Sequence, residues 1–153
     1  MGDIPSTQNM ISTIILTPTP GQILSAHREF TVKIQVANLA PGKFTAPLKT
    51  YYTAPQALNS DGHVFGHVHI TVQDLGGSLT PTRPLDPNKF VAFKGVNDVG
   101  DGKGQLQTTV KGGLPAGFYR VCTIVAAANH QPVIMPVAQR GSQDDCTKFV
   151  VEG

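Results

Sequence analysis

Three of the chain's five histidines lie in one strand-like run, DGHVFGHVHITVQDL, over residues 61–75. Two of them form the pattern His67-Val68-His69. On a β-strand, residues two positions apart project from the same face, about 6.5 to 7 Å from each other. Two imidazoles at this spacing can bind one zinc or copper ion when a third ligand arrives from another segment. The pattern is therefore compatible with a metal site.

The most attractive third ligand is His130, in the run AANHQPV. Asn129 and Pro132 mark the end of a strand there, and a residue at a strand end can lean across a sheet. His63 has the same parity as the His-x-His pair, but we expect a bulge at Gly66 to rotate it away. The sequence thus predicts one site made of His67, His69 and His130.

Two readings of the histidines remain open at this stage. A solvated strand face accepts histidine readily, and a hydrogen-bonded cluster without metal would respond to pH because histidine titrates near 6.5. The long connection that precedes this strand favours the interpretation as a metal site. A connection of more than about twenty residues between Val36 and Gly62 ends at the strand with the pair, and such long connections are often functional. It could form a lid, or an ordered arm along one edge of the fold. We take Tyr51, Tyr52 and His63 as candidate residues of a binding loop.

The elements that must position these residues are all strands. Seven runs alternate apolar and polar residues or are apolar on both faces, and Gly- and Pro-rich turns separate them. They are MISTIIL, FTVKIQV, HVHITV, KFVAF, QLQTTV, FYRVCTIVA and CTKFVV. We therefore predict one all-β domain over residues 1–153, an immunoglobulin-like antiparallel β-sandwich of about seven strands. The run LPAGFYRV, with Tyr119, is similar to the tyrosine corner of such sandwiches.

The two cysteines, Cys122 and Cys146, allow either two reduced thiols or one disulfide. If their strands are neighbours, strand parity lets both sulfur atoms emerge on the same face. A bridge would close a loop of about 24 residues and stabilise the fold by roughly 3 kcal/mol. It would also indicate an oxidising compartment.

Composition excludes several classes of function. The formal net charge is only +2, with 12 basic residues scattered along the chain, which argues against nucleic acid as a partner. No apolar run is long enough to cross a bilayer. The chain has no Gly-x-Ser-x-Gly elbow and no P-loop, and Cys122 has no neighbouring base. We therefore expect a role that is not primarily enzymatic, and no catalytic residue is assigned.

Several runs resemble a known family. They are YYTAPQALN, GHVHITVQDL, FKGVND, GLPAGFYRVCT, NHQPVIMPVAQRGSQDDC and TKFVV. They resemble the C-terminal region of a family of secreted fungal proteins, found mainly in wood-decaying and mushroom-forming species, and they cover almost the whole chain. The resemblance implies an extracellular protein, with this chain as the C-terminal part of a longer secreted precursor. It implies no particular activity.

The leading hypothesis is a secreted fungal β-sandwich protein with a divalent-metal site for zinc or copper. The alternative is an extracellular interaction module that binds a cell-wall glycan or a host-surface protein through the long loop and its tyrosines. An oxidative enzyme would need an open coordination position on the metal.

Overall fold

The computed structural model describes all 153 residues, with nine strands and one 3-10 helix, η1 (Thr7–Asn9). The strands are β1 (Ser12–Thr17), β2 (Ile23–Ser25), β3 (Phe30–Ala37), β4 (Leu39–Ala40), β5 (Val64–Gly76), β6 (Ala92–Val96), β7 (Gln105–Val110), β8 (Gly117–Ala127) and β9 (Cys146–Glu152). A strand lies at or near each of the seven predicted runs, although β6 begins at Ala92 and includes only the last two residues of KFVAF. The two additional strands, β2 and β4, are too short to show a periodic pattern. No helix in the structure is long and apolar enough to cross a membrane.

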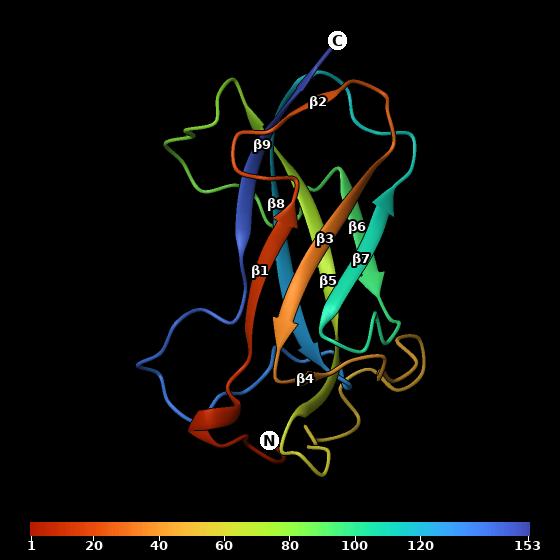
Figure 1. Ribbon diagram of the computed structural model, residues 1–153, viewed down its shortest axis with the longest axis vertical. Helices are drawn as coiled ribbons and strands as arrows, with labels where there is room; N and C mark the ends of the chain where they lie inside the picture. Colours follow the sequence, from red (N-terminus) through yellow and green to blue (C-terminus); the bar gives the residue numbers. More distant parts are fainter.

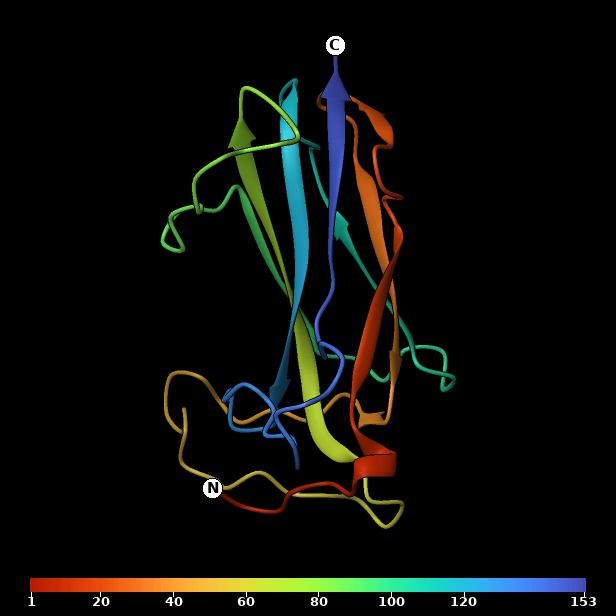
Figure 2. The same cartoon turned by 90° about the vertical axis from the view of Figure 1, so that its left-hand side faces the viewer.

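The strands form two sheets that pack face to face, as Figure 1 and Figure 2 show. The smaller sheet has the order β1-β3-β7 and is antiparallel. The larger has the order β2-β9-β8-β5-β4, and β6 pairs with β5 along the rest of its edge. The two short strands pair in parallel, β2 with β9 and β4 with β5. The predicted all-β sandwich is confirmed.

The core lies between the sheets and follows the predicted alternation. Val68, Ile70 and Val72 of β5 are at most 1% exposed, as are Val32 and Ile34 of β3. They belong to one cluster of 20 buried apolar residues to which both sheets contribute. Because alternate residues of β5 fill the core, the intervening ones, including His67 and His69, project from the outer face of the larger sheet.

Tyr119 makes the hydrogen bond expected of a tyrosine corner. Its ring is buried, and its hydroxyl donates to the carbonyl oxygen of Pro115 over 2.9 Å. The bond ties the turn before β8 to the strand itself. Burial, together with the nearby Asp74 charge, raises the pKa of this phenol. The corner predicted from the sequence is therefore present.

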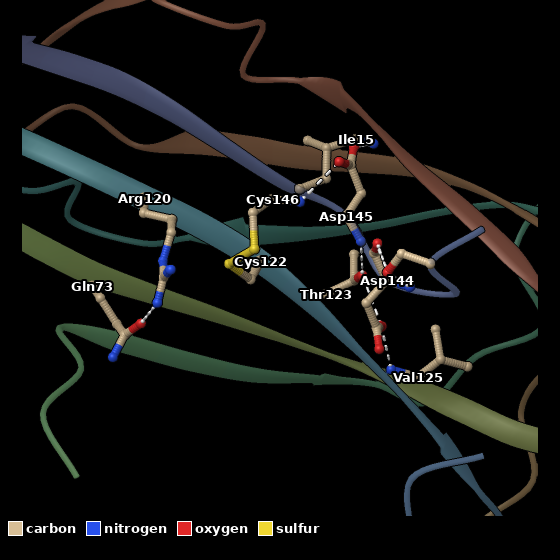
Figure 3. Close-up of a disulfide and its surroundings, with 10 residues drawn as sticks. Ile15, Gln73, Arg120, Cys122, Thr123, Val125, Asp144, Asp145 and Cys146 are labelled. Carbon is tan, nitrogen blue, oxygen red and sulfur yellow. Dashed lines mark hydrogen bonds between the residues drawn. A yellow bond between two sulfur atoms is a disulfide. The ribbon is translucent and has the colours of Figure 1, made fainter. Parts of the chain in front are cut away.

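Cys122 and Cys146 form a disulfide, which resolves the alternative left open by the sequence (Figure 3). The two residues face each other directly in the antiparallel pair of β8 and β9, with Cα atoms 4.1 Å apart. Strand parity allowed the bridge only if the two strands are neighbours, and β8 and β9 do pair with each other. The bridge fastens the start of β9 to the middle of β8.

Two adjacent aspartates next to the disulfide join separate strands, which the sequence did not predict. The Asp144 carboxylate accepts hydrogen bonds from the Val125 amide and the Thr123 hydroxyl of β8, at 2.8 and 3.0 Å. Asp145 accepts from the Ile15 amide of β1 at 2.8 Å, so it links the two sheets (Figure 3).

Candidate metal centre

Three imidazole rings converge at one end of the larger sheet. The Nε2 atom of His67 lies 3.2 Å from Nε2 of His69 and 3.1 Å from Nδ1 of His130. All three nitrogen atoms lie within 4.8 Å of one another. The structure therefore brings together the three histidines that the sequence selected as one site.

The first two imidazoles are positioned by regular strand pairing. His67 and His69 of β5 pair with Ala126 and Ile124 of β8. No register shift occurs between Gly66 and Asp74, so both rings leave the same face of an undistorted ladder. The bulge expected at Gly66 is absent; the irregularity of β5 lies between Asp74 and Gly76. Gly66 instead allows a close approach, because a Cβ atom there would lie 2.1 Å from the Ala126 carbonyl oxygen.

The third imidazole comes from the turn after β8. The amide of Ala127 donates to the carbonyl of Gln131, and the amide of His130 donates back to Ala127. His130 occupies the left-handed region, with φ of 67°. This conformation is uncommon for a residue with a side chain and costs about 1–2 kcal/mol. Strained residues of this kind persist where the surroundings hold them, and they are often functional.

The buried Asn129 side chain stabilises that turn. Its side-chain amide donates to the carbonyl of Ala54 at 2.5 Å and to Oε1 of Gln131 at 3.0 Å. Its own Oδ1 accepts from the Gln131 amide at 2.9 Å. These bonds fix the turn both internally and against the long connection, so the backbone of His130 is held on two sides.

We refer to residues 41–57 of the long connection as the cover segment. It lies against the end of the sheet that carries the histidines, and backbone hydrogen bonds hold it there. The amide of Lys43 donates to Gly66, that of Thr45 to Ala128, and that of Tyr52 to Asn129. The predicted long connection is thus an ordered segment that covers the imidazoles. As a result His67 has no exposed surface at all, and it does not lie on a wet strand face.

Two carbonyl groups of the cover segment orient the rings. Nδ1 of His67 lies 3.1 Å from the Lys43 carbonyl oxygen, and Nε2 of His130 lies 2.9 Å from that of Thr45. A carbonyl oxygen can only accept, so each of these ring nitrogens carries the proton. In the neutral imidazoles the opposite nitrogens, His67 Nε2 and His130 Nδ1, then carry lone pairs.

These two lone pairs face each other across 3.1 Å. Both are acceptors, so they cannot form a hydrogen bond with each other, and their approach is unfavourable unless a positive charge lies between them. The neighbouring His69 Nε2 can donate one proton, which satisfies only one of the two. The arrangement thus places electron pairs around a point that suits a cation.

Burial keeps the central imidazole neutral. Burial, with smaller contributions from the nearby His69 and His130 rings, lowers the pKa of His67 from 6.5 to about 4, against the opposing effect of the hydrogen bond to the Lys43 carbonyl. Burial is also the main reason why the pKa of His69 is lowered, with His130 adding to the effect. Neutral imidazole is the form that binds metal.

One side of the cluster opens into a pocket of about 490 Å³. His69 and His130 line it, whereas His67 lies behind them. Two tyrosines of the cover segment form one wall. The Tyr51 ring stacks on His130, with ring centroids 4.6 Å apart and planes 11° from parallel, and Tyr52 packs against Tyr51 at 4.2 Å. Both tyrosines predicted as binding-loop residues therefore lie at the site.

The remaining histidines lie outside the cluster. His63 precedes β5, and its backbone amide donates to the Asn59 side chain at 2.8 Å; its ring is not among the three that converge. His27 belongs to the loop before β3, where its amide donates to Leu114. His63 is therefore not part of the cluster, and no bulge at Gly66 separates it from the His-x-His pair.

Four residues that shape the site were not predicted from the sequence. Lys43 and Thr45 contribute only backbone carbonyls, and any residue type has one. Phe44 lies edge-on to His67 at 5.9 Å, and Phe93 of β6 lies 5.2 Å from His69. Strand alternation could have placed Phe93 on the outer face of the sheet, but only if the register between β5 and β6 had been known.

Residues 13–152 match a family model described as the CLU5d N-terminal domain. The chain belongs to this family. A curated relative, Pathogenicity cluster 5 protein d of the fungus Colletotrichum graminicola (strain M1.001 / M2 / FGSC 10212), is 61% identical to this chain over all 153 residues. The chain spans 32% of the length of that relative. The expectation of a fungal family is therefore confirmed.

The family match corrects one expectation. The resemblance implied a C-terminal region, but the CLU5d family is described as an N-terminal domain. The quoted motifs correctly indicated a fungal family, but they did not indicate where in the longer proteins the domain lies. Among solved structures, fibronectin(III)-like modules of Clostridium thermocellum CbhA align with 92% of this chain and 45% of their own chain, with a TM-score of 0.44 and 9% identity.

Proposed function

We propose that this CLU5d domain binds one zinc or copper ion through Nε2 of His67, Nε2 of His69 and Nδ1 of His130. One observation carries the proposal: two lone pairs, fixed by the Lys43 and Thr45 carbonyls, face each other across 3.1 Å. A divalent cation bound between them turns this repulsion into coordination.

The nitrogen spacing supports the same conclusion. In a tetrahedral zinc site with Zn–N bonds of about 2.0–2.1 Å, ligand nitrogens lie about 3.3–3.4 Å apart. The observed separations from His67 are 3.2 and 3.1 Å. Imidazole suits both zinc and copper. Carbonyl acceptors on the outer ring nitrogens are the usual means of orienting histidine ligands.

We further propose that the domain acts outside the cell. The disulfide between Cys122 and Cys146 supports this location, since such bridges persist in oxidising compartments. The name of the Colletotrichum relative, a pathogenicity cluster protein, is compatible with a protein that meets a host. Expression of the full-length protein, followed by detection of the domain in the culture medium, tests the extracellular location separately from metal binding.

Calorimetry under anaerobic conditions tests metal binding. We expect one Zn²⁺ or Cu²⁺ per chain for the wild type. The double variant His67→Ala/His69→Ala should bind at least about 100-fold more weakly, because two of three ligands are lost. His63→Ala removes a histidine outside the cluster and should bind like the wild type. Absence of binding to the wild type, or equal binding by the double variant, would refute the site.

A second candidate function is an interaction module that acts without metal. It is favoured by the exposure of the rings on the cover segment: Phe44, Tyr51 and Tyr52 are 47, 43 and 56% exposed. Exposed aromatic groups of this kind are enriched where partners bind. Pull-down of metal-free protein with chitin and β-glucan, and with host cell surfaces, tests it. Retention that survives removal of both metal and the histidines would support this second function.

A further inference from the structure

Six aromatic rings form an unbroken row across the outer face of the larger sheet and onto the cover segment. The successive centroid separations are 5.7, 5.2, 5.9, 4.6 and 4.2 Å. In order along the row, the rings are Phe90, Phe93, His69, His130, Tyr51 and Tyr52. The two phenylalanines and two tyrosines are 43 to 56% exposed. A row of exposed rings around the histidines is a surface suited to a flat, extended ligand.

Two pockets lie next to each other along this row. The pocket beside His69 and His130 shares Phe93 and Ile124 with a second pocket of about 320 Å³. The second pocket extends to Arg120, beside the disulfide (Figure 3). We refer to the two together as the outer groove. The outer groove extends from His69 and His130 to the positively charged side chain of Arg120.

The charges of the outer groove favour an anion. No acidic residue lines either of its pockets, whereas other surface pockets contain aspartates such as Asp86 and Asp98. Arg120 has no carboxylate partner. Its Nη2 donates to Oε1 of Gln73 at 2.6 Å, and its buried Nε has no hydrogen-bond partner. With a divalent ion on the histidines, the groove has a positive charge at each end.

The spacing of these two charges follows from the strand register. His69 lies opposite Ile124, and Arg120 lies four residues before Ile124 in β8. Four residues of strand span about 13 Å. A ligand that meets both cations must therefore carry anionic groups spaced along an extended chain, with apolar faces between them to stack on the rings.

We propose that the outer groove binds an acidic glycan, a chain of uronic acid residues. This inference rests on the proposed metal site. One uronate carboxylate completes the coordination of the metal, since three protein ligands leave a position for an outside ligand. The sugar faces stack on the rings of Phe93 and Tyr51, and a second carboxylate pairs with Arg120.

The groove fits a glycan better than an acidic peptide. An extended peptide gains affinity by adding main-chain hydrogen bonds to a free strand edge. The outer groove lies on the face of the sheet, where β5 and β8 already pair their backbone groups with each other. This face presents aromatic rings and the side chains of Thr71, Asn97 and Arg120. These three side chains can form hydrogen bonds with sugar hydroxyls and carboxylates.

Binding of short oligomers of galacturonic acid to zinc-loaded protein tests the proposal by calorimetry. We expect binding at least tenfold tighter than that of a neutral cello-oligosaccharide of equal length or of an acidic peptide. Removal of zinc should weaken it at least tenfold. Arg120→Gln should weaken it about fivefold or more, whereas Arg120→Lys, which keeps the charge, should lose less. Tyr51→Ala should weaken it by a similar factor.

Matched controls lie on other surfaces. Arg83→Gln removes an exposed arginine outside the groove, and Ile23→Ala removes an exposed apolar side chain on β2. Both should bind the oligomer like the wild type. Circular dichroism of each variant confirms folding. Because uronates can themselves take up zinc, gel filtration followed by elemental analysis must show that zinc stays with the protein.

The outcomes separate the two proposals. If zinc binds but the uronate oligomer does not, or binds no better than the neutral sugar, the glycan proposal is wrong and the metal site stands. Equal affinity with and without zinc, preference for the peptide, or loss of zinc to the oligomer also overturns it. If zinc does not bind at all, both proposals fail.

Discussion

Nδ1 of His130 lies 3.1 Å from Nε2 of His67, although 63 positions separate the two residues in the chain. Neither is free to turn away. The Lys43 carbonyl oxygen accepts a hydrogen bond from Nδ1 of His67, and the Thr45 carbonyl oxygen accepts one from Nε2 of His130. The cover segment thus does more than exclude water, because it sets which nitrogen of each ring faces the centre.

The backbone of His130 can be separated from its imidazole by comparing two substitutions. His130→Gly and His130→Ala both remove the ring, its contact with Tyr51 and any ligation. Only glycine occupies the left-handed region without cost, so the glycine variant should be more stable than the alanine variant by about 1 kcal/mol. Urea unfolding of the metal-free proteins measures the difference. Equal stability would contradict the strain assigned to this turn.

Gly66 should tolerate no side chain. A Cβ atom there would lie 2.1 Å from the Ala126 carbonyl oxygen. Gly66→Ala must therefore shift β5 against β8 next to His67, and it should cost about 1–3 kcal/mol or more and weaken metal binding. Gly77→Ala is the matched control, because nothing lies within 4 Å of the added atom. Its stability should stay within about 0.5 kcal/mol of the wild type. A Gly66→Ala variant as stable as this control would show that the close approach is not required.

The disulfide should support the fold and leave the metal site intact. The bridge spans 24 residues, so Cys122→Ala/Cys146→Ala should lower the free energy of unfolding by about 3 kcal/mol in the chain-entropy model. His67, His69 and His130 are positioned by β5, the turn after β8 and the cover segment, so metal affinity should change less than about threefold. Denaturant titration and calorimetry on the same sample measure both. A folded variant that no longer binds metal would contradict this separation.

Asp144 should make stability depend on pH. Burial raises the pKa of its carboxyl above the usual 3.8, although hydrogen bonds from Val125 and Thr123 oppose the shift. The folded state then holds this proton more readily than the unfolded state. The resulting stabilisation is complete below the ordinary carboxyl pKa and is lost as pH rises through the raised value.

Asp144→Asn keeps an oxygen acceptor for both hydrogen bonds but cannot ionise. Relative to the wild type, it should therefore gain stability as the pH rises from about 4 to about 7. Urea unfolding at several pH values measures this trend. Asp61→Asn removes an exposed carboxylate and serves as the control. If the difference between Asp144→Asn and the wild type is independent of pH, or has the opposite sign, the assigned pKa shift is wrong.

Much of this architecture could be predicted because it rests on local patterns. The alternation of apolar and polar residues predicted Val68, Ile70 and Val72 in the core and His67 and His69 on the opposite face of the strand. The structure places all five residues as predicted. Strand parity allowed the Cys122–Cys146 bridge. A histidine at a strand end could be selected as the third ligand because so few histidines were available.

What the sequence could not predict depends on tertiary contacts. The burial of His67 comes from the cover segment, whose residues show no periodicity. The orienting groups at Lys43 and Thr45 are backbone carbonyls, which leave no trace in the residue types. The bulge expected at Gly66 was wrong because the glycine there serves a close approach to Ala126. Glycine in a strand is compatible with either role.

The metal content of the protein is the most direct test of the central claim. The domain should be produced without a histidine tag, in medium containing zinc and copper, and analysed by elemental mass spectrometry after gel filtration. We predict close to one ion of zinc or copper per chain, and almost none in His67→Ala/His69→Ala, while His63→Ala keeps the wild-type content. A wild-type protein without metal, or a double variant that retains it, would contradict the account.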